Sequence, residues 1–241
     1  MATLSIVGTP IGNLEDVTLR ALKALAAADT ILCEDTRVTK RLLGRHGIDR
    51  PTLSYHAHSG AARADLAVAM LREGKSLALV SDAGTPGISD PGAELVARVR
   101  RELAGELADG RLKIEAVPGP SALTAALSVA GVPCADFTFF GFLPHKKGRE
   151  TLFKEIAAME RTAVFYESPH RLMKALGSLV EHIGPAPKRV TVCRELTKVF
   201  EEVVAGTAAE ARAYFAAAPG KVRGELAIIV SAAGKPDKAG E

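Results

Sequence analysis

The sequence contains no tryptophan, and Phe, Tyr and Trp together make up 5% of its 241 residues. Proteins that hold single-stranded nucleic acid by base stacking need several exposed aromatic side chains, so this composition argues against such a platform. Only three cysteines are present, Cys33, Cys134 and Cys193, and they form no CxxC motif and no Cys/His cluster. We therefore expect neither a disulfide framework nor a zinc site.

Long apolar runs are also missing. The first residues, MATLSIVGTPIG, lack the basic region and the longer apolar run of a signal peptide, and no stretch is long enough to predict a membrane span. The net charge of +3 tolerates a polyanionic partner but does not require one. These features predict a soluble, cytoplasmic protein without membrane contact.

Short β-branched runs alternate with amphipathic helical patterns along the whole chain. Strands are predicted at 3–8, 30–35, 52–56, 76–81, 112–117, 137–142, 162–167, 188–195 and 225–231. Helices are predicted at 18–29, at 92–103 and after the turn at 118–120. This alternation is typical of parallel or mixed sheets covered on both faces. We predict two α/β domains, residues 1–117 and 118–235, and a tail at 236–241.

Two glycine-rich turns follow predicted strands, GTPIGN at 8–13 and SDAGTPG at 81–87. In open α/β sheets, ligands bind beyond the carboxyl ends of strands, where glycine lets the main chain approach closely. An ordinary strand–helix turn is the alternative for each. GTPIGN lacks the third glycine of GxGxxG, and the Gly-Lys-Ser at 74–76 enters a strand instead of opening a helix. A site built mainly for phosphates is therefore disfavoured.

Polar and basic segments follow several predicted strands. In EDTRVTKRLLGR, at 34–45, Asp35 or Thr36 is expected to cap a helix, and the basic residues that follow form either a phosphate-binding side or a solvated face. In FYESPHR, at 165–171, Ser168 and Pro169 suit a helix start. His56 and His58 have no nearby third ligand, so a metal site is not expected.

Seven segments taken together resemble one known family. They are VGTPIGNLEDVTLRAL, EDTR, SDAGTPGISDPG, VPGPSAL, GFLPHKKGR, FYESPHR and CRELTK, in this order. The chain is similar over nearly its whole length to the tetrapyrrole methylase superfamily, and within it to bacterial 16S ribosomal RNA cytidine 2′-O-methyltransferases. The resemblance implies two α/β/α domains with S-adenosyl-L-methionine (SAM) in a cleft between them. It also implies a homodimer that acts on 16S rRNA within the small ribosomal subunit.

The resemblance assigns cofactor contacts residue by residue. They are Pro10, Ile11, Gly12, Asp82, Ala83, Gly84, Thr85, Ser121, Ala122, Tyr166, Leu226 and Ala227. Tetrapyrrole relatives carry GPGD in the first turn, where this sequence has a neutral asparagine at the last position, and this departure suggests a different methyl acceptor. Because SAM carries no phosphates, backbone donors and acceptors at close range suit it better than a phosphate-binding turn.

A ribose hydroxyl is a poor nucleophile, so a general base would help methyl transfer. Glu167 is the preferred candidate and Asp35 the second; Asp82 and positioning without a base are the alternatives. Phosphate contacts are expected from basic residues on loops. They are Arg37, Lys40, Arg41, Lys146, Lys147, Arg149, Arg171, Arg194 and Lys198. A methyltransferase for a tetrapyrrole or another small molecule, and a non-catalytic binding module, are the competing functions.

Overall fold

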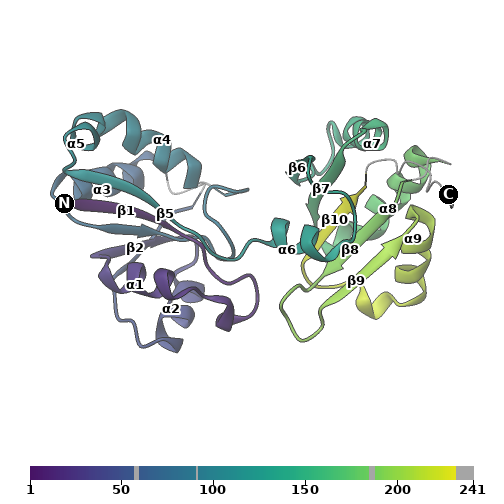
Figure 1. The fold of residues 1–241 in the computed structure, drawn as a ribbon, viewed down its shortest axis with the longest axis horizontal. Helices are drawn as coiled ribbons and strands as arrows, with labels where there is room; N and C mark the ends of the chain where they lie inside the picture. The colour runs from purple at the N-terminus through teal and green to yellow at the C-terminus, as the bar shows by residue number, and fades with distance from the viewer. Residues whose placement is uncertain (57–59, 91, 185–187, 232–241) are drawn as a thin grey trace, which may run out of the picture. The chain divides into compact units, whose positions relative to one another are not determined.

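The computed structural model describes residues 1–56, 60–90, 92–184 and 188–231. The chain forms two compact units, and the first, Met1–Ser121, is followed by one that begins at Ala122 (Figure 1). This boundary lies just after the turn Pro118–Pro120, whereas the sequence placed it just before that turn. The predicted tail at 236–241 and His58 lie outside the described residues.

A five-stranded parallel sheet forms the centre of the first unit, in the order β3-β2-β4-β1-β5. Its strands are β1 (Ala2–Val7), β2 (Thr30–Cys33), β3 (Thr52–Ser54), β4 (Leu77–Leu79) and β5 (Leu112–Val117). The five predicted strands of this unit are confirmed, but β2, β3 and β4 are shorter than predicted. The polar residues that follow β2 and β4 leave the sheet and form the turns described below.

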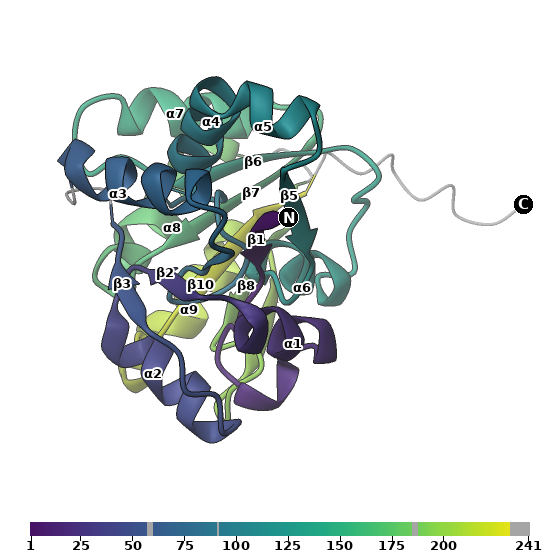
Figure 2. The same ribbon diagram turned by 90° about the vertical axis from the view of Figure 1, so that its left-hand side faces the viewer.

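Helices cover both faces of this sheet (Figure 2). They are α1 (Leu19–Ala27), α2 (Thr36–Arg45), α3 (Gly60–Arg72), α4 (Gly92–Glu102) and the short α5 (Ala104–Ala108). On one face Leu25 of α1 and Leu43 of α2 pack with Ile31 of β2. On the other, Val68 of α3 and Leu95 of α4 pack with residues of β1 and β4. The apolar residues at helical spacing therefore face the sheet, as an amphipathic pattern requires.

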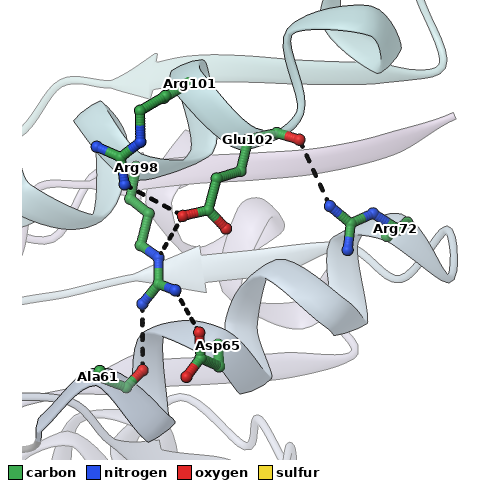
Figure 3. A network of polar contacts seen from close by, with 6 residues as sticks. All are labelled: Ala61, Asp65, Arg72, Arg98, Arg101 and Glu102. Atoms are coloured by element: carbon green, nitrogen blue, oxygen red, sulfur yellow. Dashed lines mark hydrogen bonds and ion pairs between the residues drawn. The ribbon is translucent and has the colours of Figure 1, made fainter.

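A polar network joins α3 to α4 (Figure 3). Arg98 forms ion pairs with Asp65 and Glu102 and donates to the carbonyl oxygen of Ala61 at 3.2 Å. The backbone oxygen of Glu102 accepts from Arg72 at 3.4 Å. The Arg98 side chain is only 19% exposed, so these bonds are better shielded from water than an ordinary surface pair. The network therefore ties the two helices on this face of the sheet to each other.

The second unit contains a mixed sheet in the order β6-β7-β10-β8-β9. Its strands are β6 (Phe137–Phe142), β7 (Thr162–Glu167), β8 (Val190–Arg194), β9 (Glu202–Gly206) and β10 (Leu226–Val230). Only β6 and β7 run parallel; the other neighbours are antiparallel. The sequence did not predict β9. As an edge strand it alternates exposed and half-buried residues, which leaves a weak hydrophobic signal.

Among the described residues of this unit, the α-helices are α6 (Ala122–Val129), α7 (Arg149–Ala158), α8 (Pro169–Ile183) and α9 (Ala208–Ala217). Phe153 of α7, Leu176 of α8 and Phe215 of α9 share one buried cluster with Phe165 and Ile228 of the sheet. They therefore cover the same face. None of the described helices is long and apolar enough to cross a membrane.

Two glycines let the ends of β1 and β5 approach each other in the first unit. The Gly8 amide donates to the oxygen of Val117 at 3.0 Å, and Gly119 lies against it after the end of β5. A Cβ atom at Gly8 would lie 2.7 Å from the Gly119 nitrogen, and one at Gly119 would lie 2.7 Å from the Gly8 oxygen. Both contacts involve backbone atoms, so neither neighbour can rotate away.

We expect Gly8→Ala to lower the free energy of unfolding by about 1–3 kcal/mol, because the added methyl group forces apart two main-chain segments. Gly44→Ala in α2 is the matched control, since a Cβ there meets no atom within 4 Å. It should leave stability unchanged or raise it by up to about 1 kcal/mol. Urea unfolding of both variants measures this, and a Gly8→Ala protein as stable as the wild type contradicts the contact.

Candidate functional site

The two glycine-rich turns of the first unit bind each other at the carboxyl edge of its sheet. The Thr9 amide donates to the Gly84 oxygen at 2.9 Å, and the Gly84 amide donates to the Thr9 oxygen at 3.1 Å. The Thr9 hydroxyl also donates to the oxygens of Ser81 and Gly84, at 3.1 and 3.3 Å. The turns therefore form one structure, and they are more than isolated strand–helix connections.

A hydrogen bond links the end of β2 to the same turn. The Asp35 amide donates to Asp82 Oδ1 at 2.9 Å. Burial raises the pKa of Glu34 above its usual range, and the negative charges of Asp82 and Asp90 raise it further. This edge of the sheet thus holds several carboxylates at an electrostatic cost. Sequence reasoning missed Glu34, although its place at a strand end was a usable signal.

The glycines and aspartates after β4 have separate structural tasks. Gly84 and Gly87 have φ angles of 82° and 89°, a region that side chains with a Cβ rarely adopt. Asp90 Oδ1 accepts from the amides of Gly87 and Gly92, both at 2.7 Å, and so closes the loop. The composition of this segment therefore reflects a loop that is closed by an aspartate side chain on main-chain amides, with glycines at the positions that need a positive φ.

The residues predicted to contact the cofactor in the first unit gather at this edge. Gly12, Asp82 and Ala83 are exposed there, whereas Pro10, Ile11 and Gly84 are buried beneath them. Thr85 is half-buried and donates to the Pro120 oxygen at 3.4 Å, next to Ser121. Exposed main chain over a buried support is an arrangement that can present backbone groups to a small molecule.

In the second unit, the predicted cofactor residues meet at the end of β7. Ala227 pairs with Tyr166, and Leu226 pairs with Glu167, across neighbouring antiparallel strands. The pKa of Tyr166 is raised by burial, an effect partly offset by a hydrogen bond with the Leu123 backbone at the start of α6, beside Ala122. Leu226 and Ala227 are themselves buried in the sheet.

Glu167, the preferred base, is fully buried in an ion triad. Its Oε2 lies 2.6 Å from Arg149 Nη2, and its Oε1 lies 2.7 Å from Arg171 Nη2. The Ser168 amide also donates to Oε1 at 2.8 Å. Both carboxylate oxygens are thus engaged inside the protein, so Glu167 does not fit the role of proton acceptor for a substrate.

Asp35 does not fit that role either. Its carboxylate caps α2 by accepting from the Arg37 amide at 2.8 Å, as predicted, and it also pairs with the Arg37 guanidinium. These bonds lower the pKa of Asp35 to about 2, which makes it a weak base. Ser168 does precede α8, but its hydroxyl makes no cap and instead accepts from Arg171 at 3.3 Å.

The basic residues predicted to contact RNA divide into two groups. Five are exposed: Arg37, Lys40, Arg41, Lys146 and Lys147. The other four need correction, because they serve the fold. Arg149 and Arg194 are buried against Glu167 and Glu202. Arg171 and Lys198 are half-buried in ion pairs with Glu167 and with Glu195 and Glu225. Sequence alone could not separate the groups, since buried arginines and exposed ones look alike without their partners.

In the described part of the chain, no three His, Cys, Asp or Glu side chains are placed to hold a metal ion. Cys33 and Cys193 are buried thiols, and Cys134 is exposed. Burial raises the pKa of Cys193 to about 11, so this thiol stays protonated and unreactive near neutral pH.

Comparison with known proteins shows which family this chain belongs to. The family of tetrapyrrole (corrin/porphyrin) methylases matches residues 3–212. The chain therefore belongs to the tetrapyrrole methylase family. Within that family it groups with the ribosomal RNA small subunit methyltransferase I proteins.

Three relatives with that name illustrate the similarity. The protein of Mesorhizobium japonicum is 46% identical over 95% of this chain and 75% of its own length. That of Thermotoga maritima is 44% identical over 96% of this chain and 99% of its own. The protein of Escherichia coli O157:H7 is 42% identical over 94% of this chain and 77% of its own.

Solved structures share the fold at lower identity. The methyltransferase CobJ superposes with a TM-score of 0.70 at 20% identity, covering 97% of this chain and 95% of that one. A uroporphyrin-III C-methyltransferase of Thermus thermophilus, solved with S-adenosylhomocysteine, gives 0.62 at 19% identity, covering 96% and 97%. The predicted fold class, α/β with two sheets in the tetrapyrrole methylase arrangement, is confirmed.

The raised pKa of Glu34 leads to a prediction about pH and stability. A carboxyl group whose pKa is higher in the folded state stabilises the fold most when protonated, and this contribution is lost as pH rises through that pKa. Glu34→Gln keeps the size and polarity of the side chain without its charge, so it should unfold at a higher temperature than the wild type at pH 8. The advantage should shrink toward pH 4.

Glu73→Gln is the matched control for Glu34→Gln, because Glu73 is exposed and pairs with Lys75. It should change the unfolding temperature little at either pH. A Glu34→Gln protein that is less stable than the wild type at pH 8 would show that the charge of Glu34 stabilises the edge.

Proposed function

We propose that this protein transfers a methyl group from SAM to the ribose 2′-oxygen of a cytidine in 16S rRNA of the small ribosomal subunit. The observation that carries the proposal is the 42–46% identity, over 94–96% of this chain, to proteins named ribosomal RNA small subunit methyltransferase I. The resemblance further supports a homodimer that works in the cytoplasm.

The edge of the first sheet fits the chemistry of SAM. This cofactor carries no phosphates and is positively charged at its sulfur and its amino group. The turns offer main chain at Gly12, Asp82 and Ala83, where the side chains are small or exposed. The carboxylates Glu34 and Asp82 add negative potential, which favours a cation. We propose that Pro10–Gly12, Asp82–Thr85 and Ser121 form the part of the cofactor site that this unit supplies.

The second unit supplies the remaining cofactor residues of the proposal. Tyr166, at the end of β7, is half-buried and packs against Phe139 and Phe142, with ring centres 5.0 and 5.4 Å apart. Ala122, Leu226 and Ala227 lie next to it or pair with its strand, as described above. A half-buried aromatic ring packed against other apolar side chains suits an adenosine better than it suits a charged group.

When bound, SAM supplies an electrophilic methyl group that an oxygen nucleophile can attack in line. We propose that the chain contributes by binding and orienting the acceptor ribose, since orientation alone can remove several kcal/mol from a barrier. Glu167 and Asp35 are both paired with arginines, so we assign neither of them as the general base. Because Asp82 is assigned to the cofactor site, we propose positioning as the main catalytic contribution of the protein.

The basic residues that remain exposed supply the RNA contacts of the proposal. Arg37, Lys40 and Arg41 lie on α2, directly after the carboxyl end of β2, and Lys146 and Lys147 lie in the loop before α7. Phosphate contacts of this kind position a nucleic acid without reading its sequence. We therefore assign binding strength to these side chains and the choice of nucleotide to the reaction site.

A methyltransferase for tetrapyrroles is the alternative with the same cofactor. The structures of that kind are 19–21% identical to this chain, which shows a common fold and no more. The exposed cationic side of α2 favours a polyanion over a small anionic ring. The neutral Asn13, in place of the acidic residue of the tetrapyrrole enzymes, also favours a different acceptor.

The direct test uses small ribosomal subunits from cells that lack this protein. Incubated with methyl-labelled SAM and the purified protein, the subunits should gain label at one cytidine, and the bond 3′ to it should resist alkaline hydrolysis because its 2′-oxygen is blocked. Label in an added tetrapyrrole and none in the subunits would support the alternative. Absence of label in both would contradict methyl transfer of either kind.

Arg37 and Arg111 form a matched pair for testing the RNA contacts. Each pairs with an aspartate two residues earlier, Arg37 with Asp35 at 2.6 Å and Arg111 with Asp109 at 2.7 Å. Arg37 follows the carboxyl end of β2, whereas Arg111 precedes the amino end of β5, at the opposite edge of the parallel sheet.

Arg37→Ala should weaken binding to small subunits and reduce the slope of log affinity against log salt by about 1, because one phosphate contact is lost. Arg111→Ala should change neither quantity. Affinity for SAM should stay the same in both variants. Binding measured across a salt series decides this, and equal slopes for Arg37→Ala and the wild type would remove Arg37 from the RNA contacts.

A further inference from the structure

The buried triad of the second unit contains two cations and one anion. Arg149 and Arg171 share the carboxylate of Glu167, whose side chain is fully buried, while those of Arg149 and Arg171 are 3% and 17% exposed. Taking three charges out of water is costly, and apolar side chains of the same size often give equal or greater stability. Stability alone therefore does not explain the triad, and the next contacts of its two arginines point to a second role.

Those contacts hold the loop between β6 and α7. Arg171 Nη1 donates to the Leu143 oxygen at 3.0 Å, and Arg149 Nη1 donates to the Pro144 oxygen at 3.2 Å. The Arg149 amide donates to the Lys146 oxygen at 3.2 Å. Main-chain groups at three places in one short loop are thus tied to the two arginines, and Glu167 holds both guanidinium groups in the orientation that this requires.

The loop that is held carries exposed basic residues. His145, Lys146 and Lys147 are all exposed, whereas Leu143 before them is buried. The triad itself has one more positive than negative charge, so it adds to the field of the lysines instead of neutralising it. A free loop would lose conformational entropy on binding a phosphate backbone, and a loop fixed in advance avoids much of that loss.

We propose that Glu167 is a positioning residue for the RNA substrate. Through Arg149 and Arg171 it fixes the loop Leu143–Gly148 so that Lys146 and Lys147 meet phosphates of the small subunit. This inference rests on the proposed function, and it gives Glu167 a role that does not require a free carboxylate.

The test is a double-mutant cycle on Arg171 and the two lysines. Arg171→Lys keeps a cation beside Glu167, but a single ammonium group cannot reproduce the planar fork that reaches both Glu167 and the Leu143 oxygen. Arg171→Gln is the second variant; it leaves Arg149 paired with Glu167 and no charge unpaired, so the fold has no isolated buried charge. Arg161→Gln is the control, because Arg161 pairs with Asp136 in the same unit with both side chains 64% exposed.

Binding to small subunits is measured across a salt series for each protein, and amide exchange is followed at residues 145–148. Lys146→Ala with Lys147→Ala should reduce the salt slope by about 2. Either Arg171 variant should reduce the slope comparably and speed exchange in the loop. Adding an Arg171 substitution to the lysine variant should cause little further loss. Arg161→Gln should match the wild type, and affinity for SAM should be unchanged throughout.

Two results would overturn the positioning role. One is that the losses in salt slope from the Arg171 and lysine substitutions add fully; the other is an Arg171 variant with the wild-type salt slope and wild-type amide exchange in the loop. If Arg171 had only a structural role, its substitution would lower stability, but the lysine substitutions would still reduce the salt slope in the Arg171 variant. The cycle therefore separates a structural role from a positioning role. If the wild-type protein methylates small subunits and the losses add, only this inference fails. If it neither binds nor methylates them, the proposed function fails first.

Discussion

Close approach of main chain to main chain at the carboxyl edge of the first sheet is the constraint on which this structure depends. Gly8 and Gly119 leave no room for a Cβ atom between the ends of β1 and β5. Thr9 and Gly84 exchange two backbone hydrogen bonds between the turns after β1 and β4. With these contacts in place, the turns present main chain instead of long side chains, and the proposed SAM site depends on this feature.

The two units carry opposite charges at the places assigned to function. In the first unit, the carboxylates Glu34, Asp82 and Asp90 make the electrostatic potential at the sheet edge negative. Together with burial, the charges of Asp82 and Asp90 raise the pKa of Glu34. In the second, Arg149 and Arg171 outnumber the single carboxylate between them. In the proposed reaction, a cationic cofactor would relieve the first imbalance, and the second would attract an RNA phosphate backbone. The proposed reaction thus gives both groups of charges a purpose.

Much of this arrangement could be predicted from residue patterns. The parallel strands of the first unit, the turns at 8–13 and 81–87, and the cap at Asp35 follow from period, glycine spacing and helix-start signals. The edge strand β9 could not be predicted, because its residues alternate weakly between exposed and half-buried. The partners of Glu167 could not be predicted either. Arg149 is 18 residues away in sequence, and only tertiary packing turns a candidate base into the centre of an ion triad.

The central claim is that this chain binds SAM, and calorimetric titration with its demethylated product, S-adenosylhomocysteine, tests it most directly. The product cannot react, so the measured heat reports binding alone. We predict saturable binding to the wild-type protein that weakens when Asp82 is replaced by Ala. Folded protein that shows no binding of the product or of SAM, with or without small ribosomal subunits, would contradict the account.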